Sequence, residues 1–179
     1  MTRARVAANL SAPDYFLMRR IHRWRPPRWV RVWMLAASRA GDGWLWWCCG
    51  IAVLASNDAA SLHAVGAATL AILSGILIFR MLKRAVGRKR PCALEPHVWA
   101  NLLPPDQFSF PSGHSITAFA AAVSLGAFYP AALPVLVFCA ASVAVSRLLL
   151  GMHFLSDVLA GSALGAALGY AAALLFRGF

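Results

Sequence analysis

Apolar runs alternate with short polar segments over most of the chain. After a turn signal at 41–43 (GDG), the runs cover 44–57, 62–82, about 115–130, about 132–150 and about 154–176. A helix needs about 20 residues to cross a bilayer, so the pattern predicts five transmembrane helices. The run at 44–57 is short, and its N-terminal end must reach back through the turn. If 29–43 crosses as well, there are six.

The stretch 14–40 has a different pattern. Bulky apolar residues alternate with arginines at about every third or fourth position, and Pro26-Pro27 divides the stretch into two pieces. This spacing is typical of amphipathic helices that lie at a membrane interface. The alternative is a cytosolic tail, which the tryptophan and phenylalanine side chains disfavour.

Composition supports a membrane protein. Of 179 residues, 60% are hydrophobic and 13% are charged, which is too apolar for a soluble domain. Small residues crowd the apolar runs, as at 161–173, and allow helices to pack closely. We therefore predict an all-α integral-membrane helical bundle, with 1–43 as a basic interfacial segment and 44–179 as the transmembrane domain.

The charge balance indicates which kind of partner the chain binds. Lysine and arginine number 17 against six acidic residues, giving a net charge of +11. Nine arginines precede Gly41, and most of the other basic residues lie at 80–90. Such clusters are typical of loops that flank membrane spans, so we expect the partner to be a lipid bilayer with anionic lipids and not nucleic acid.

Three segments combine unusual polar residues with these loops. They read KRAVGRKRP at 83–91, PSGH at 111–114 and SRLLLGMHFLSD at 146–157. Alternate crossings place Lys83, His114, Arg147 and His153 on one side of the membrane. The polar side chains are therefore expected to converge.

The cations suit a phosphate, which carries about two negative charges as a monoester. Lys83 and Arg90 are seven residues apart, about two helical turns, and would share a face if the helix continues past residue 82. Arg147 lies in an otherwise apolar run, where a charge is costly and usually functional. The three side chains could clamp a phosphate, with planar two-point contacts from the arginines. Alternatively, the basic run at 83–90 is only a collar beside the membrane.

The remaining polar residues could perform the chemistry. Ser112 and Gly113 introduce a helix whose N–H groups and dipole favour an anion, although Ser112 could also be an ordinary N-cap. His153 and Asp157 stand at i and i+4, so the aspartate could fix the ring tautomer and free the other nitrogen to attack phosphorus. The alternative is a capping pair. His114 by itself would be read as a polar residue at a membrane edge.

In this order the segments form KxxxxxxRP, PSGH and SRxxxxxHxxxD, and the chain resembles the type 2 phosphatidic acid phosphatase family. The resemblance implies a membrane lipid phosphatase that hydrolyses a lipid phosphate or polyprenyl diphosphate, such as phosphatidic acid, phosphatidylglycerol phosphate or undecaprenyl diphosphate. It implies that His153 forms a phosphohistidine, that Asp157 orients it, and that His114 protonates the leaving oxygen and later activates water. The residues expected to bind the phosphate are Lys83, Arg90, Ser112, Gly113 and Arg147.

Neither a metal nor a cofactor is expected. The six acidic residues are dispersed singly, whereas metal-dependent phosphatases hold their ions with grouped carboxylates. Three alternatives stay open: a lipid phosphotransferase with the same intermediate, a non-catalytic lipid-binding membrane protein, and a vanadate-dependent haloperoxidase. The last class is soluble, so the apolar runs disfavour it.

We expect a multi-pass protein of the cell membrane, such as a bacterial inner membrane. With five spans the arginine-rich N-terminus and the polar ends share the cytosolic side, and with six the polar ends face outward. The sequence leaves this choice, the identity of the lipid and the oligomeric state open.

Overall fold

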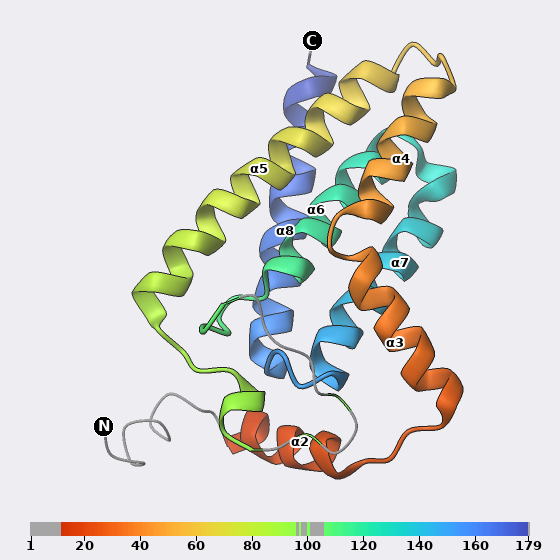
Figure 1. Cartoon of the computed structure of the whole chain (residues 1–179). Helices are drawn as coiled ribbons and strands as arrows, with labels where there is room; N and C mark the ends of the chain where they lie inside the picture. Colours follow the sequence, from red (N-terminus) through yellow and green to blue (C-terminus); the bar gives the residue numbers. More distant parts are fainter. Residues whose placement is uncertain (1–11, 96, 98–99, 101–105, 179) are drawn as a thin grey trace.

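The computed structural model describes residues 12–95, 97, 100 and 106–178. Within these ranges the chain forms seven α-helices and two short 3₁₀ helices, with no β-strand (Figure 1). The all-α prediction is therefore confirmed. Helices α2 (Ala12–Arg23) and α3 (Arg28–Ala40) are the two expected pieces of the basic stretch, and the break between them contains Pro26-Pro27.

Three segments are long and apolar enough to cross a membrane. They are α5 (Ser61–Val86), the continuous segment of η2 (Pro130–Ala132) and α7 (Leu133–Leu149), and α8 (Leu155–Arg177). Helices α4 (Trp44–Ala55) and α6 (Gly113–Phe128) are apolar but shorter. Large apolar side chains on α5 point outward and are exposed, among them Leu62, Leu73 and Leu77. Such an apolar exterior suits a lipid environment and not water.

Helix α6 lies at the centre of the bundle, packed against α5, α7 and α8 (Figure 1). Its contact with α8 is made by the two backbones, because glycines stand where the helices meet. A Cβ on Gly161 would lie 2.7 Å from the carbonyl oxygen of Ser112, and one on Gly169 would lie 2.6 Å from that of Ala120. The close packing expected from the small residues is present here.

Helices α3 and α4 follow one another up one side of the bundle, with a turn at Gly41–Gly43 between them (Figure 1). Gly43 has φ +121°, a conformation that L side chains rarely adopt. Helix α3 packs against α7, while α4 packs against α5. The division of the chain at residue 43 stays a prediction.

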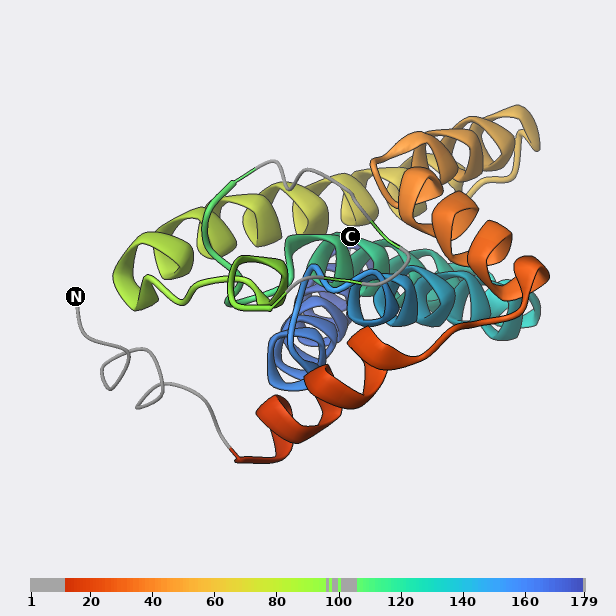
Figure 2. The ribbon, with the colours of Figure 1, turned by 60° about the horizontal axis from the view of Figure 1, so that its bottom comes forward.

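Helix α2 lies across one end of the bundle, where α7 ends and α8 begins (Figure 2). Its buried residues are Asp14, Met18, Ile21 and His22. The end of α5, the short 3₁₀ helix η1 (Pro91–Ala93) and the start of α6 lie at the same end. Every polar segment singled out in the sequence is therefore located at one end of the molecule.

Candidate active site

A cavity of about 820 Å³ opens at this end of the bundle. Among the polar residues that line it are Lys83, Arg90, Asp106, His114 and His153. Three of the predicted residues, Ser112, Arg147 and Asp157, are buried and do not line the cavity. The structure thus brings the two histidines and two of the three cations together around one space.

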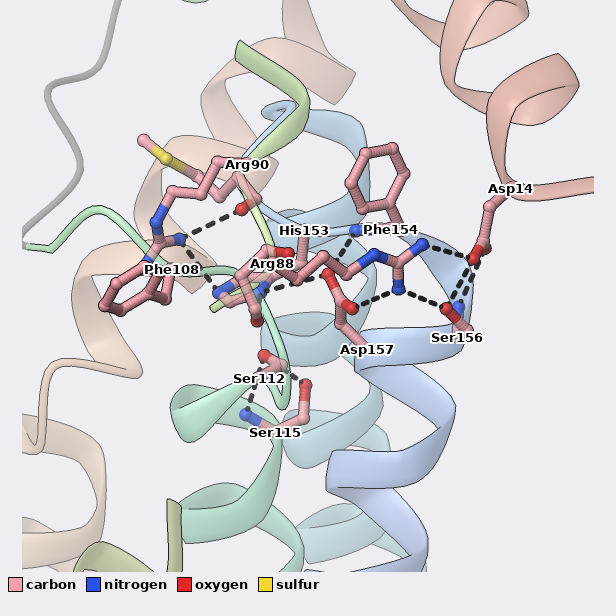
Figure 3. A network of polar contacts seen from close by, with 12 residues as sticks. Asp14, Arg88, Arg90, Phe108, Ser112, Ser115, His153, Phe154, Ser156 and Asp157 are labelled. Atoms are coloured by element: carbon pink, nitrogen blue, oxygen red, sulfur yellow. Dashed lines mark hydrogen bonds and ion pairs between the residues drawn. The ribbon is translucent and has the colours of Figure 1, made fainter. Parts of the chain in front are cut away.

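His153 lies in the turn after α7, one residue before the N-cap of α8, and is 2% exposed. Its Nδ1 is 2.7 Å from the carbonyl oxygen of Ser109, and its Nε2 is 3.1 Å from Nη1 of Arg90 (Figure 3). A carbonyl can only accept, so Nδ1 carries the proton, and the lone pair of Nε2 accepts a hydrogen bond from Arg90. Burial, together with the nearby Arg90 and Arg147, lowers the pKa of His153 to about 3. The ring is neutral, as a nucleophile must be.

Asp157 does not make the predicted hydrogen bond to His153. Its Oδ2 lies 3.7 Å from Nδ1 of the histidine and accepts instead from the backbone N–H of Phe154, at 2.8 Å. Its Oδ1 accepts from Nη1 of Arg88, at 2.6 Å. The capping alternative is therefore formed, because the carboxylate sits in the first turn of α8 where free N–H groups attract it. The Ser109 carbonyl fixes the tautomer instead.

Lys83 and Arg90 both bind Asp106, an acid to which the sequence assigned no role. The Lys83 Nζ is 2.5 Å from Oδ2, and Arg90 donates from Nη2 to Oδ1 at 2.8 Å and from Nε to the Asp106 carbonyl at 2.9 Å. Burial raises the pKa of Asp106, but the bonds from the two cations outweigh it and hold the pKa at about 2. An ionised carboxylate therefore bridges the predicted phosphate clamp.

Arg147 is buried within α7 and donates from Nη1 to the hydroxyl of Ser38 on α3, at 2.6 Å. Its Nε is also buried and has no hydrogen-bond partner within the described part of the chain. A buried N–H without a partner is unusual and marks a place where an acceptor would be stabilised. The guanidinium of Arg147 is thus held in place by Ser38 but forms no ion pair with the acidic residues that the structure describes.

The PSGH segment starts α6. The Ser112 hydroxyl accepts from the backbone N–H of Ser115 at 3.4 Å and from its hydroxyl at 2.9 Å, so its N-cap role is realised. Gly113 and His114 line the cavity. His114 contacts Asp42 in the turn between α3 and α4, with 2.7 Å between Nε2 and Oδ1. Asp42 is the second acid whose role the sequence did not reveal.

A buried network ties α2 to the site (Figure 3). Arg88 donates to Asp157 as described and from Nη2 to Asp14 on α2, at 2.8 Å. Ser156 bonds both Arg88 and Asp14, and the guanidinium of Arg88 lies 4.2 Å from the centre of the Phe154 ring. Arg88 is therefore part of the interior and not of a solvated collar.

Metal independence stays a prediction. Among the residues that the structure describes, no three His, Cys, Asp or Glu side chains group in a way that could hold a metal ion.

The fold and the cavity define a helical membrane protein whose buried neutral histidine faces a cluster of cations. The chain belongs to the PAP2 superfamily, whose sequence profile matches residues 64–178. All three sequence signatures fall inside that range, so the family suggested by the motifs is confirmed.

Characterised relatives are lipid phosphatases. The decaprenylphosphoryl-5-phosphoribose phosphatase of Mycobacterium tuberculosis is 36% identical over 143 residues, which cover 78% of each chain. The lipid A 1-phosphatase of Rhizobium johnstonii is 34% identical over 109 residues, covering 59% of this chain and 44% of that protein.

Two solved structures have the same fold. LpxE of Aquifex aeolicus superposes with a TM-score of 0.75 and 25% identity, covering 94% of this chain and 97% of that one. The transmembrane PAP2-type phosphatidylglycerolphosphate phosphatase of Bacillus subtilis superposes with a TM-score of 0.69 and 25% identity, covering 97% of this chain and 89% of that one. Together with the apolar helices, these likenesses support a multi-pass membrane protein.

Proposed function

We propose that this protein is a metal-independent lipid phosphatase that works through a phosphohistidine on His153. The observation that carries the proposal is the neutral His153 ring, whose Nε2 accepts a hydrogen bond from Arg90 at a cavity lined by Lys83, Arg90 and His114. A phosphate in that cavity would meet cations on its oxygens and a nucleophile on its phosphorus. This geometry suits phosphoryl transfer, which depends mainly on positioning and charge stabilisation.

The chemistry has two steps. Nη1 of Arg90 transfers its hydrogen bond from His153 to a phosphate oxygen, which frees the Nε2 lone pair. Nε2 then attacks phosphorus, the bond to the leaving oxygen breaks, and His114 gives that oxygen a proton. Water, deprotonated by His114, then attacks the phosphohistidine and releases phosphate. Lys83, Arg90 and the unpartnered Nε of Arg147 stabilise the negative charge, and the first turn of α6, which begins at Gly113 after the N-cap Ser112, supplies N–H groups.

An apolar groove of about 330 Å³ supports a lipid substrate. It runs between α4, α5 and α6 and shares four lining residues with the cavity: Gly41, Asp42, Ile76 and Thr117. An aliphatic chain in the groove would leave its phosphate at the cavity. We propose five crossings, with α3 and α4 together making the first, and a place in a bacterial inner membrane.

The substrate class can be tested directly. Purified protein in detergent is offered phosphatidic acid, phosphatidylglycerol phosphate, lipid A 1-phosphate, undecaprenyl diphosphate and a polyprenylphosphoryl ribose 5-phosphate, and released phosphate is measured without any acceptor. We expect turnover of at least one lipid, with polyprenyl-linked substrates as first candidates because the mycobacterial relative covers most of the chain. EDTA should have no effect, while vanadate should inhibit.

Two results would contradict the proposal. Loss of activity in EDTA that added metal restores would exclude the metal-independent mechanism. Label transfer to a lipid or sugar acceptor, without release of free phosphate to water, would indicate the phosphotransferase.

Asp106 provides a second prediction, because its carboxylate holds the nitrogen atoms that a phosphate would need. The Asp106→Asn variant should bind vanadate about tenfold more tightly, equivalent to about 1.4 kcal/mol, since the competing charge is removed. The inhibition constant measures this directly. Glu95→Gln removes the same charge from a residue that contacts Tyr15 and Arg19 instead, and should leave the constant unchanged. Weaker binding by Asp106→Asn would mean that Asp106 positions the cations.

A further inference from the structure

The break between α3 and α4 packs directly against the ring of His114. A Cβ on Gly41 would lie 2.5 Å from Cγ1 of Val143 and 3.3 Å from Cδ2 of His114, so a larger residue would force Val143 to move. With Gly43 at φ +121°, the turn bends around Asp42. The turn lies outside residues 64–178, the part that matches the family profile.

In the neutral ring of His114, Asp42 determines which nitrogen carries the proton. Its Oδ1 is 2.7 Å from Nε2, and a carboxylate accepts, so Nε2 donates. The Cδ2 and Nε2 edge of the ring faces the turn, which leaves Nδ1 on the opposite edge. Within the described part of the chain, Nδ1 makes no hydrogen bond. His114 lines the cavity and its side chain is 21% exposed.

The charges around His114 are mainly positive. Burial, Arg147 on α7 and Lys83 on α5 disfavour a proton on the ring. The cavity also contains Arg80, Arg84, Arg90, Asp106 and His153. Asp42 is the carboxylate that contacts the ring and attracts a proton to it. Without that contact, a protonated imidazole would be strongly disfavoured next to the two cations.

We propose that Asp42 is a positioning residue for His114: it accepts from Nε2–H and stabilises the imidazolium, whose Nδ1–H supplies the proton used in the reaction. This inference rests on the proposed function. In the first step the proton on Nδ1 moves to the ester oxygen, which keeps the electron pair of the breaking P–O bond. In the second step Nδ1 takes a proton from the attacking water, and the electron pair of the P–N bond returns to His153. After both steps His114 has regained the proton that it gave up, and His153 has regained its lone pair.

Substrates with different leaving groups distinguish a role in proton transfer from a structural role for Asp42. Two synthetic amphiphiles that share an alkyl chain are compared, an alkyl phosphate and a nitrophenyl phosphate whose leaving oxygen needs no proton. The Asp42→Asn variant should lose about 10- to 100-fold in kcat/KM on the alkyl ester, within what a general acid contributes, and less than about threefold on the aryl ester. Asp58→Asn, in the exposed turn between α4 and α5, is the matched control and should behave as wild type.

Two further readouts accompany this test. The alkaline limb of the pH profile on the alkyl ester should move to lower pH in Asp42→Asn, because the imidazolium loses its carboxylate. In a His114→Ala background, Asp42→Asn should have no additional effect. Equal losses on both esters, or additive losses in the double variant, would overturn the assignment. Failure of the proposed function is distinguishable, since wild-type protein would then hydrolyse neither ester.

Discussion

The His153→Ala variant is expected to release phosphate from a lipid phosphate at least about 1,000-fold more slowly than wild type, because the variant has no nucleophile to form the intermediate. Wild-type protein incubated with labelled substrate and quenched in base should carry a phosphoryl label that is stable to base and lost in acid. The variant should carry none. Rate and label are measured on the same preparations.

His63→Ala is the matched control, since His63 is an exposed histidine near the start of α5. It should keep both the rate and the label. Circular dichroism establishes that each variant is folded. A folded His153→Ala protein that still acquires the label would exclude His153 as the nucleophile. Because the pKa of His153 is about 3, its protonation should not reduce activity above about pH 4.

The Arg88→Met variant is expected to lose about 3–5 kcal/mol of unfolding free energy, the range found when one partner of a buried ion pair is removed. Arg88 is the cation that pairs with both Asp14 and Asp157, which are 4% and 0% exposed. Its removal leaves two buried carboxylates without that partner. Denaturant or thermal unfolding in detergent measures the loss.

Two companion variants make the stability prediction specific. Lys89→Met changes the exposed neighbour and should stay within about 0.5 kcal/mol of wild type. Adding Asp14→Asn to Arg88→Met should recover part of the loss, because one of the two buried charges is removed. An Arg88→Met protein as stable as Lys89→Met would show that the network contributes little.

The sequence predicted the helices and the convergence of the polar segments because both depend on local patterns. Apolar runs define α5, α7 and α8, and a charge inside such a run identified Arg147. The residues that were missed act over long range. Asp42 and Asp106 are ordinary acids in their own segments and meet His114 and the cations only after folding.

Other parts of the site left little or no trace in the sequence. The contact that fixes the His153 tautomer is the backbone carbonyl of Ser109, which any residue type could supply. Arg88 looked like one more member of a basic run. Its partner did leave a signal, because Asp14, Met18 and Ile21 are spaced as one face of a helix, and an acid on an apolar face implies a buried cation.

The backbone contact between α6 and α8 constrains the catalytic histidines, whereas the side chains that line the apolar groove are free to vary. His114 stands at the start of α6 and His153 just before α8, so the glycines that let these helices touch also set the distance between acid and nucleophile. The apolar groove proposed for the lipid's aliphatic chain is lined in part by side chains of α4 and α5, which can change in size without moving either histidine. A designer seeking a different lipid specificity would vary that wall and leave the α6–α8 pair unchanged.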